Sequence, residues 1–500
     1  MNLYPILHHQ IITQTGPEPN GITHISYDSR TIGNQGCFIC IRGEQSDGHR
    51  FIDMAVNQGA VQVIGDDEEA LHEHALRHPH VQFILVQEPK KAMALYAAHL
   101  EEDPHHELSL IGVTGTQGKT TITAYVRSLL NRSGIKTGSI GTAGVWDHEK
   151  PLPLPKSTPT TPESADLFDY LSRMRQKQIT SVVMEATSIG LDQDRLHGLH
   201  FDVAVHSNLS PEHLDYHETF EAYKQAKLRL FDHAETAVVN VDDDGMSQDI
   251  LDAFTGPVWT YGMNREADVK AENLRYTKQG SHLDLIVDGV SHDVFLPVFG
   301  LHNVYNAIAA ITVCLAKGLG LRHLLTRLSS LEGPPGRLQL IPEVSDRLML
   351  FDFAHTPQTL TNLFHTIKPL RYKRLIVMVT GIGIREKSLR APIAEAVEGR
   401  ADEIVVTADH PGNETAEAVV ADVMAGFRST KNVHPVAYRG EAIQKAMSLS
   451  SEGDLVLITG ICMEDFRIIN GEKQPYYDYD YVRDFLCKHP CLKSKVASAN

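Results

Sequence analysis

Short apolar runs alternate with amphipathic stretches along the whole chain. Near the N-terminus, an apolar run at Cys37–Ile41 precedes a helical pattern at Phe51–Gln58 and a second apolar run at Val61–Ile64. Apolar runs of about four to eight residues are typical of strands that are buried on both faces. Such strands, separated by helical stretches, predict parallel sheets with helices on both faces, which is an α/β fold.

The same alternation continues after residue 107 and again after residue 337. In the first of these regions we expect strands at Leu108–Val113 and Ser181–Glu185, and helices at Ile122–Leu130 and Phe220–Phe231. In the second, we expect strands Leu348–Phe353, Arg374–Val379, Glu403–Thr407 and Leu455–Gly460, and helices Pro357–Ile367 and Glu414–Phe427.

Two short segments interrupt this alternation. Glu101–Glu107 (EEDPHHE) is polar, and Gly333–Gly336 (GPPG) is rich in residues that break regular structure, so both are interpreted as linkers. A chain of 500 residues is also too long for one hydrophobic core. The sequence therefore predicts three domains, at residues 1–100, 101–335 and 336–500.

The composition narrows the class of protein. Hydrophobic residues make up 42% of the chain, and 63 acidic against 46 basic residues give a net charge of −17. Such an acidic chain is a poor non-specific binder of nucleic acid, which attracts proteins through lysine and arginine. No apolar run approaches the roughly 20 residues that span a bilayer, and no signal-peptide pattern opens the chain. We expect a cytoplasmic enzyme without nucleic-acid or membrane partners.

Cysteine and histidine patterns do not predict a metal site. The six cysteines are too few for a disulfide framework, and Cys37 and Cys40 have no second pair with which to hold zinc. The 27 histidines include no H-E-x-x-H and no comparable ligand spacing.

The strongest local signal is Leu110–Thr121, which reads LIGVTGTQGKTT. A buried strand enters a glycine-rich turn, and Lys119 and Thr120 then precede a helix. Such a turn directs backbone N–H groups and a helix N-terminus at an anion. Lys119 would contact the β/γ-phosphates of a nucleotide, and the Thr120 hydroxyl would coordinate Mg²⁺. Val113 replaces the first glycine of the strict phosphate-loop pattern G-x-x-x-x-G-K-[ST]. The alternative is an ordinary strand–turn–helix with a surface lysine. The strand–loop–helix context favours ATP binding.

Three further features follow this loop. An apolar strand ends at Glu185, and parallel sheets bind ligands at the carboxyl ends of their strands. Glu185 would also suit an ordinary role as a helix cap or loop residue. The segment His206–His217 (HSNLSPEHLDYH) contains three histidines, and its composition leaves metal binding open. The helix predicted at Phe220–Phe231 carries Lys224 and Lys227, which the pattern alone predicts to be solvated.

These residues carry a family resemblance. GTQGKTT, EATS, SNLSPEHLDYH and AYKQAKLRLF, in this order, resemble the central domain of the Mur ligases, and the chain is most similar to the MurE type, which adds the third residue of the peptidoglycan stem peptide. The resemblance extends over essentially the whole chain. Its other motifs are Tyr27–Arg30 (YDSR), Gly43–His49 (GEQSDGH), Leu301–Asn306 (LHNVYN), Gly333–Arg337 (GPPGR) and Asp352–Pro357 (DFAHTP).

The resemblance implies a three-domain α/β fold and a set of site residues. A central P-loop-type parallel sheet would be flanked by an N-terminal UDP-binding domain and a C-terminal Rossmann-like domain that receives the amino acid. The catalytic set would be Lys119, Glu185, His213 and Lys227, with Thr120, Glu185, His213 and Lys227 at the metal. Residues expected at ATP are Gly115, Thr116, Gln117, Gly118, Lys119, Thr120, Thr121, Asn303, Asn306, Arg337 and Asp352. Residues expected at the UDP-muramoyl peptide are Ser29, Arg30, Thr160, Thr161, Ser188, Gln193 and Arg195.

The resemblance also implies the reaction and its cofactors. ATP and Mg²⁺ would convert a substrate carboxylate to an acyl phosphate, which the amine of a free amino acid then attacks. Lys227 matches the lysine that the family carries as a carbamate formed with CO₂. An ammonium cannot ligate a cation, whereas a carbamate carries a carboxylate that can. The expected partners are small molecules, namely a UDP-muramoyl peptide and an amino acid, and the chain is expected to be a monomer.

The amino-acid end departs from the family pattern. Diaminopimelate-adding members carry Asp-Asn-Pro-Arg, whose arginine grips the distal carboxylate. Here the stretch is DHPGNE, with Gly412 in the arginine's place, and losing that contact would weaken diaminopimelate binding by about 1.5–3 kcal/mol. Two other segments also differ from the family pattern. They are GICME at Gly460–Glu464 and GIREKSLR at Gly383–Arg390. Residues expected at the amino acid are Arg385, Asp409, His410, Gly412, Gly460 and Glu464.

Several functional interpretations follow. The first is a stem-peptide ligase whose acceptor is closer to L-lysine than to diaminopimelate. The second is a paralogue that joins a different amino acid to a related carboxylate outside peptidoglycan synthesis. A nucleotide-sugar-binding pseudoenzyme is disfavoured because the catalytic set is intact, and a generic P-loop kinase or transport ATPase leaves YDSR and DFAHTP unexplained. His410, Cys462 and Met463 also suit plain packing roles.

Overall fold

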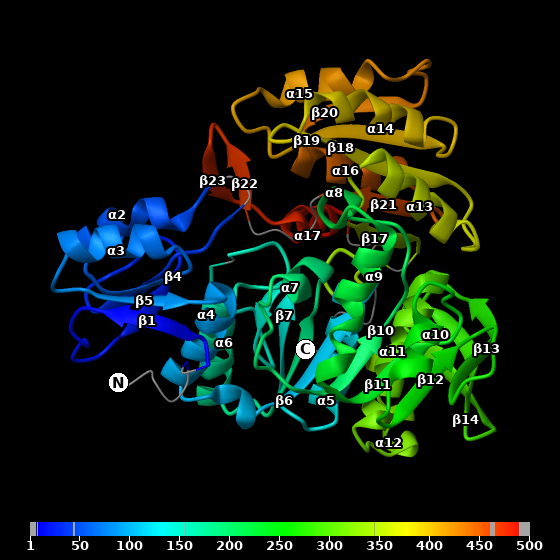
Figure 1. Cartoon of the computed structure of the whole chain (residues 1–500). Coiled ribbons are helices and arrows are strands. Elements are labelled where there is room, and N and C mark those ends of the chain that lie inside the picture. Colours follow the sequence, from blue (N-terminus) through cyan, green and yellow to red (C-terminus); the bar gives the residue numbers. More distant parts are fainter. Residues whose placement is uncertain are drawn as a thin grey trace. The chain divides into compact units, whose positions relative to one another are not determined.

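The computed structural model describes residue 7 and residues 9–43, 46–155, 157–344, 346–460 and 466–489. The chain forms two compact units, Met1–Lys270 with Ile308–Arg327, and Ala271–Ala307 with Leu328–Asn500. Figure 1 shows helices and strands alternating throughout both.

The first unit begins with a five-stranded sheet in the order β1-β5-β4-β3-β2, in which only β1 is antiparallel. Successive residues along an extended strand point to opposite faces, so Cys37 in β3 and Cys40, which directly follows β3, pack in different hydrophobic clusters. The elements are β1 (Ile11–Thr15), β2 (His24–Ser26), β3 (Gly36–Ile39), a 3₁₀ turn (Gly48–Phe51), α2 (Ile52–Asn57), β4 (Ala60–Gly65), α3 (Glu68–Arg77), β5 (Gln82–Val86) and α4 (Pro89–Leu100).

A second sheet of the same unit contains the strands β12-β11-β10-β6-β9-β7-β8 in that order. All of these neighbours are parallel except β8, so their carboxyl ends share one edge. The elements are β6 (Ser109–Thr114), α5 (Lys119–Arg132), β7 (Thr137–Gly141), β8 (Gly144–Trp146), α6 (Ser164–Gln176), β9 (Ser181–Glu185), α7 (Ser188–Asp192), β10 (Phe201–His206), α8 (Leu214–His217), α9 (Phe220–Leu228), a 3₁₀ turn (Phe231–His233), β11 (Ala234–Asn240), α10 (Ser247–Ala253), β12 (Val258–Gly262) and α12 (Leu321–Leu325).

The polar segment Glu101–Glu107 is more ordered than the predicted linker. It contains a 3₁₀ turn at Pro104–His106, whose proline is buried. Arg175 donates hydrogen bonds to Glu102 and Glu107, and the His105 ring meets Phe168 edge-on. The segment therefore packs against α6, which its composition alone did not indicate.

The second unit is built on a six-stranded sheet in the order β16-β17-β21-β18-β19-β20, in which only β16 is antiparallel. Residues of β17 and β18 alternate between two hydrophobic clusters, so both faces are covered. The elements are β13 (Val269–Tyr276, which begins in the first unit), β14 (Ser281–Val287), β15 (Val290–Leu296), α11 (Leu301–Ala316, which ends in the first unit), a 3₁₀ turn (Leu328–Ser330), β16 (Gln339–Leu340), β17 (Leu348–Asp352), α13 (Pro357–Ile367), β18 (Leu375–Ile382), a 3₁₀ turn (Lys387–Leu389), α14 (Arg390–Val397), β19 (Glu403–Asp409), α15 (Ala416–Met424), β20 (Val433–Tyr438), α16 (Arg439–Leu449), β21 (Leu455–Thr459), β22 (Phe466–Ile469), β23 (Glu472–Pro475) and α17 (Asp478–Lys488).

The predicted α/β alternation is thus present in both units, and the predicted strands agree with the observed ones to within a few residues. The predicted helix Phe51–Gln58 is instead a 3₁₀ turn followed by a short α-helix, and the predicted helix Phe220–Phe231 ends at Leu228. Within the described parts of the chain, no helix has both the length and the apolar character needed to cross a bilayer.

Candidate active site

The glycine-rich loop joins β6 to α5, at the carboxyl edge of the central sheet. Gly115 has φ 142° and Gly118 has φ 88°, so both adopt backbone conformations that side chains disfavour. A Cβ at position 115 would overlap Ser207 Oγ and stand 3.0 Å from the carbonyl oxygen of Asn208. The Thr116 N–H donates to that same carbonyl at 2.8 Å, which ties the loop to the end of β10. The loop conformation therefore depends on glycine at 115.

Lys119, the first residue of α5, folds back over this loop. Its Nζ donates to the carbonyl oxygens of Gly115 (2.8 Å) and Thr116 (2.9 Å). Burial lowers the pKa of Lys119, and attraction to Glu185 and Glu212 partly offsets that effect. The ammonium thus lies where an anion bound at the loop would be close to it.

Glu185 is buried at the carboxyl end of β9. Its carboxylate accepts hydrogen bonds from Thr120 Oγ1 at 3.0 Å and from the Thr142 N–H at 2.7 Å. Burial raises the pKa of Glu185, while Lys119 and these hydrogen bonds oppose the rise. A carboxylate beside a threonine hydroxyl is the kind of oxygen pair that Mg²⁺ prefers. Thr142 was not predicted from the sequence, because only its closeness to Glu185 distinguishes it.

Lys227 is buried on α9, which corrects the expectation from the pattern that it is solvated. Its Nζ donates to the Gly115 carbonyl oxygen at 2.8 Å and lies 4.7 Å from the centre of the Tyr223 ring. Burial, reinforced by the nearby charge of Lys119, holds the pKa of Lys227 well below its usual range. Lys224, by contrast, forms ion pairs with Glu221 and Asp249.

The histidines of His206–His217 do not converge on one point. His206 is buried and contacts Asp243 at 2.9 Å, whereas the His213 side chain is about half exposed, with its ring centre 6.3 Å from that of Tyr223. His217 is buried, edge-on to Tyr216, with its ring centre 5.4 Å from that of Tyr223. The three histidines of this segment are not among the groups whose ligand atoms lie close enough together to hold one ion in the described part of the chain.

Four of the residues predicted for the UDP substrate form one hydrogen-bonded group beside Glu185. Thr161 Oγ1 donates to the Glu185 carbonyl oxygen at 2.9 Å, and Arg195 Nη1 donates to the Thr161 carbonyl oxygen at 2.9 Å. Gln193 accepts from Arg195 at 2.8 Å, and Thr160 shares a hydrogen bond with Thr142 at 3.0 Å. Near them, Ser188 is buried at the start of α7.

The other two predicted UDP residues lie in the turn after β2. Ser29 is buried and its hydroxyl contacts Met54 Sδ at 3.2 Å. Arg30 is largely exposed and forms a two-pronged ion pair with Asp28.

The second unit contains the remaining residues predicted for ATP. Asn303 and Asn306 are buried on α11, where Asn303 Nδ2 donates to the Phe299 carbonyl oxygen at 2.9 Å. Arg337 is exposed, with its guanidinium 5.3 Å from the centre of the Phe353 ring. Asp352 accepts from two backbone N–H groups, and burial raises its pKa.

Residues predicted for the amino acid lie at the carboxyl ends of β18, β19 and β21. Asp409 is buried, with Arg439 Nη1 3.4 Å away and Arg467 Nε 3.8 Å away. His410 is buried too, and its Nδ1 accepts from the Ile468 N–H at 2.9 Å, which supports the packing interpretation. Arg439 and Arg467 were missed by sequence reasoning, because no motif marks them.

Gly412 occupies the place of the family's arginine in an unusual setting. Its φ is 65°, its N–H donates to the Ile468 carbonyl oxygen at 3.0 Å, and an added Cβ would stand 2.9 Å from Ile384 Cγ2. Gly460 also has positive φ, and Arg385 is exposed. Glu464, Cys462 and Met463 lie outside the described residues.

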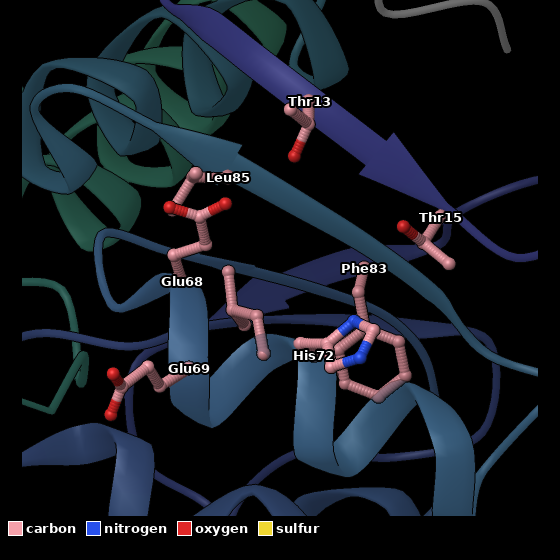
Figure 2. Close-up of a pocket in the computed structure, with 8 residues that line it drawn as sticks. Thr13, Thr15, Glu68, Glu69, His72, Phe83 and Leu85 are labelled. Carbon is pink, nitrogen blue, oxygen red and sulfur yellow. The ribbon is translucent and has the colours of Figure 1, made fainter.

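A groove of about 490 Å³ lies elsewhere, between β1, β5 and α3, and none of the predicted site residues lines it. Figure 2 shows threonines from β1 facing acidic residues and His72 from α3 across it; the lining residues are Thr13, Thr15, Glu68, Glu69, Leu71, His72, Phe83 and Leu85.

Three family models match the chain. Residues 21–100 match the Mur ligase family catalytic domain, residues 113–314 the Mur ligase middle domain, and residues 336–462 the Mur ligase glutamate ligase domain. The chain belongs to the Mur ligase family. It is of the MurE type, has the three-domain α/β fold of these enzymes, and is an ATP-dependent ligase.

Relatives of this Mur ligase extend over its whole length. UDP-N-acetylmuramoyl-L-alanyl-D-glutamate--2,6-diaminopimelate ligase 1 of Clostridium acetobutylicum is 35% identical over 93% of this chain and 95% of its own. The corresponding ligase of Geobacillus kaustophilus is 34% identical over 92% and 94%. A solved structure of a ligase of the same name has 28% identity, covers 95% of this chain and 98% of its own, and gives a TM-score of 0.68.

Proposed function

We propose that this Mur ligase joins a free amino acid to UDP-N-acetylmuramoyl-L-alanyl-D-glutamate with ATP, in peptidoglycan precursor synthesis. The observation that carries the proposal is the arrangement at Gly115, where the side chains of Lys119 and Lys227 both donate to one carbonyl beside Glu185. A phosphate loop alone would suit many ATPases. The second buried lysine, Lys227, is not part of a phosphate loop and stands where the Mur ligase resemblance implies a carbamate.

The chemistry follows from this arrangement. The substrate carboxylate attacks the γ-phosphorus of ATP, ADP leaves, and the amine of the amino acid then displaces phosphate from the acyl phosphate. Lys119 stabilises the charge that accumulates on the phosphoryl oxygens. Mg²⁺ would neutralise phosphate charge. Thr120 and Glu185 would hold it, together with His213 and the carbamate of Lys227. The hydrogen bond between Thr120 and Glu185 keeps both oxygens on one side of the loop, which suits that role.

Lys227 suits a carbamate for two reasons. Only the neutral amine reacts with CO₂, and burial lowers the pKa of Lys227, which favours that form. Conversion to a carbamate also replaces a positive charge next to Lys119 with a negative one. The adjacent Tyr223 hydroxyl shares a hydrogen bond of 3.0 Å with Thr116 and borders the same space.

The acceptor we propose is an amino acid with a distal amine, close to L-lysine. Named relatives add diaminopimelate, but Gly412 offers no guanidinium for a second carboxylate. Its positive φ and its contact with Ile384 also disfavour any larger side chain there. We further propose ATP, Mg²⁺ and CO₂ as the small-molecule requirements, a monomeric state, and domain boundaries near residues 100 and 335.

Phosphate release from ATP tests the proposal directly. The assay combines UDP-N-acetylmuramoyl-L-alanyl-D-glutamate with single amino acids, among them lysine, ornithine, diaminopimelate, alanine, serine and glutamate. Release that requires both the nucleotide-sugar and a diamino monocarboxylic acid is the expected result. A kcat/KM for diaminopimelate above that for lysine would overturn the acceptor assignment and leave the ligase assignment intact. ATP binding without turnover with any acceptor would favour the paralogue with another donor.

A further inference from the structure

We propose that Asp53, His74 and His78 form a zinc site in the N-terminal part of the first unit, remote in sequence from the ligase motifs. Asp53 lies in the first turn of α2, His74 lies in the last turn of α3, and His78 caps that helix. The two histidines are four residues apart, which places their rings on one face of the helix. Their ring planes are nearly parallel, at 9°, with centres 6.4 Å apart.

The donor atoms of these side chains converge. Asp53 Oδ1 lies 3.0 Å from His74 Nδ1 and 2.7 Å from His78 Nε2, and all three atoms lie within 4.8 Å of one another. Zinc bonds of about 2.0–2.2 Å in tetrahedral geometry place neighbouring donors about 3.3 Å apart. An outward shift of roughly half an ångström would therefore admit the ion.

The donor set fits zinc rather than a harder cation. Two imidazole nitrogens and one carboxylate oxygen are typical zinc ligands, and three protein ligands leave a fourth position for water. An ion from solvent can reach the cluster at Asp53, whose side chain is 45% exposed. The side chains of His74 and His78 are mostly buried.

Arg77 is the residue that competes with the ion. Its Nη1 lies 2.6 Å from Asp53 Oδ2, the oxygen that faces away from the histidines, and its Nη2 lies 3.3 Å from His74 Nε2. When Nδ1 of His74 binds a metal, Nε2 carries a hydrogen and can no longer accept from Arg77. The guanidinium then has to leave His74, which lowers the affinity of the native protein for zinc.

Zinc titration of the full-length protein, free of nucleotide and Mg²⁺, tests this site. Competition with a chromophoric chelator should show that Asp53→Asn and His78→Gln each weaken binding at least tenfold, while Arg77→Gln tightens it at least threefold. His72→Ala is the matched control, an exposed histidine of the same helix outside the donor set, and should stay within twofold. Zinc should also raise the Tm of the native protein and not that of Asp53→Asn.

Cobalt gives an independent reading, because three-ligand tetrahedral Co²⁺ has strong visible absorption bands that octahedral Co²⁺ lacks. Those bands should be present in the native protein and absent from the Asp53→Asn and His78→Gln variants. A metal-free Tm and a circular dichroism spectrum close to those of the native protein establish that the variants fold. Zinc affinity within twofold of the native value in both variants would overturn the proposal and leave a hydrogen-bonded ion cluster. Weaker zinc binding by Arg77→Gln would overturn the role of Arg77 as a competitor.

Discussion

Replacing Gly115 by alanine is expected to disable the phosphate loop. The backbone at 115 has φ 142°, and the added Cβ would overlap Ser207 Oγ. Ser207 cannot turn away freely, because its hydroxyl donates to the Gln117 carbonyl oxygen at 2.6 Å. A lost hydrogen bond of about 0.5–1.5 kcal/mol, backbone strain of about 1–2 kcal/mol and overpacking of about 1–3 kcal/mol together amount to roughly 3–6 kcal/mol.

This energy should be lost from ATP binding. The free loop can relax around the new methyl group, whereas bound phosphates need the loop in the conformation described here. A loss of 3 kcal/mol or more corresponds to a decrease in affinity of at least about 100-fold, which titration calorimetry with ATP and Mg²⁺ can measure. Adding Ser207→Ala to Gly115→Ala should restore part of the affinity by removing the overlapping atom.

Gly134→Ala is the matched control, since Gly134 also has positive φ (85°) but an added Cβ would meet nothing within 4 Å. Gly134→Ala should therefore bind ATP as the native protein does and lose only the stability that backbone strain accounts for. ATP affinity of Gly115→Ala within threefold of that of Gly134→Ala would refute the steric argument.

Three other variants probe the buried charges. Lys227→Met should abolish turnover. In CO₂-free buffer at neutral pH it should also resist denaturant better than the native protein, because the native fold disfavours the buried ammonium. This gain in stability should shrink as the pH approaches 10.5, and a gain that does not change with pH would contradict the prediction. The Mg²⁺ concentration needed for ATP binding should rise as the pH falls toward the raised pKa of Glu185, because the protonated carboxyl group no longer attracts the cation. In Glu185→Gln this pH dependence should be absent. If it persists in that variant, a group other than Glu185 takes up the proton. Arg439→Leu leaves the buried carboxylate of Asp478 without its two-pronged partner and should lower the free energy of unfolding in urea by about 3–5 kcal/mol. The control Arg173→Leu removes an exposed ion pair and should lower it by less than about 0.5 kcal/mol. Equal effects would argue against a structural role for Arg439.

Elements defined by local chemistry were predictable from the sequence. The strand Ser181–Glu185 and the helix Pro357–Ile367 match their predicted bounds, and the latter begins with a capping box at Thr356 and a proline in its first turn. The helix predicted from Ile122 instead begins at Lys119, because the Gly118 turn brings the lysine and threonines directly into helical conformation. Apolar periodicity does not register those polar residues.

Burial of polar groups was not predictable, since it depends on contacts distant in sequence. Lys227 is separated by 112 residues from the carbonyl that its side chain contacts, and nothing local distinguishes it from Lys224. Asp53 is likewise 21 and 25 residues from the histidines it meets, and no local motif links them. The family resemblance supplied the role of Lys227, and it had no counterpart for the histidine cluster.

In the proposed reaction, the carboxylate of the nucleotide-sugar attacks ATP before the amide forms. The most direct test uses UDP-N-acetylmuramoyl-L-alanyl-D-glutamate with ¹⁸O in the reacting carboxylate, and mass spectrometry of the phosphate released with lysine present. The acyl phosphate route transfers one labelled oxygen to each phosphate as the amide forms. Unlabelled phosphate would mean that water attacks ATP and that this chain does not form the amide through an acyl phosphate.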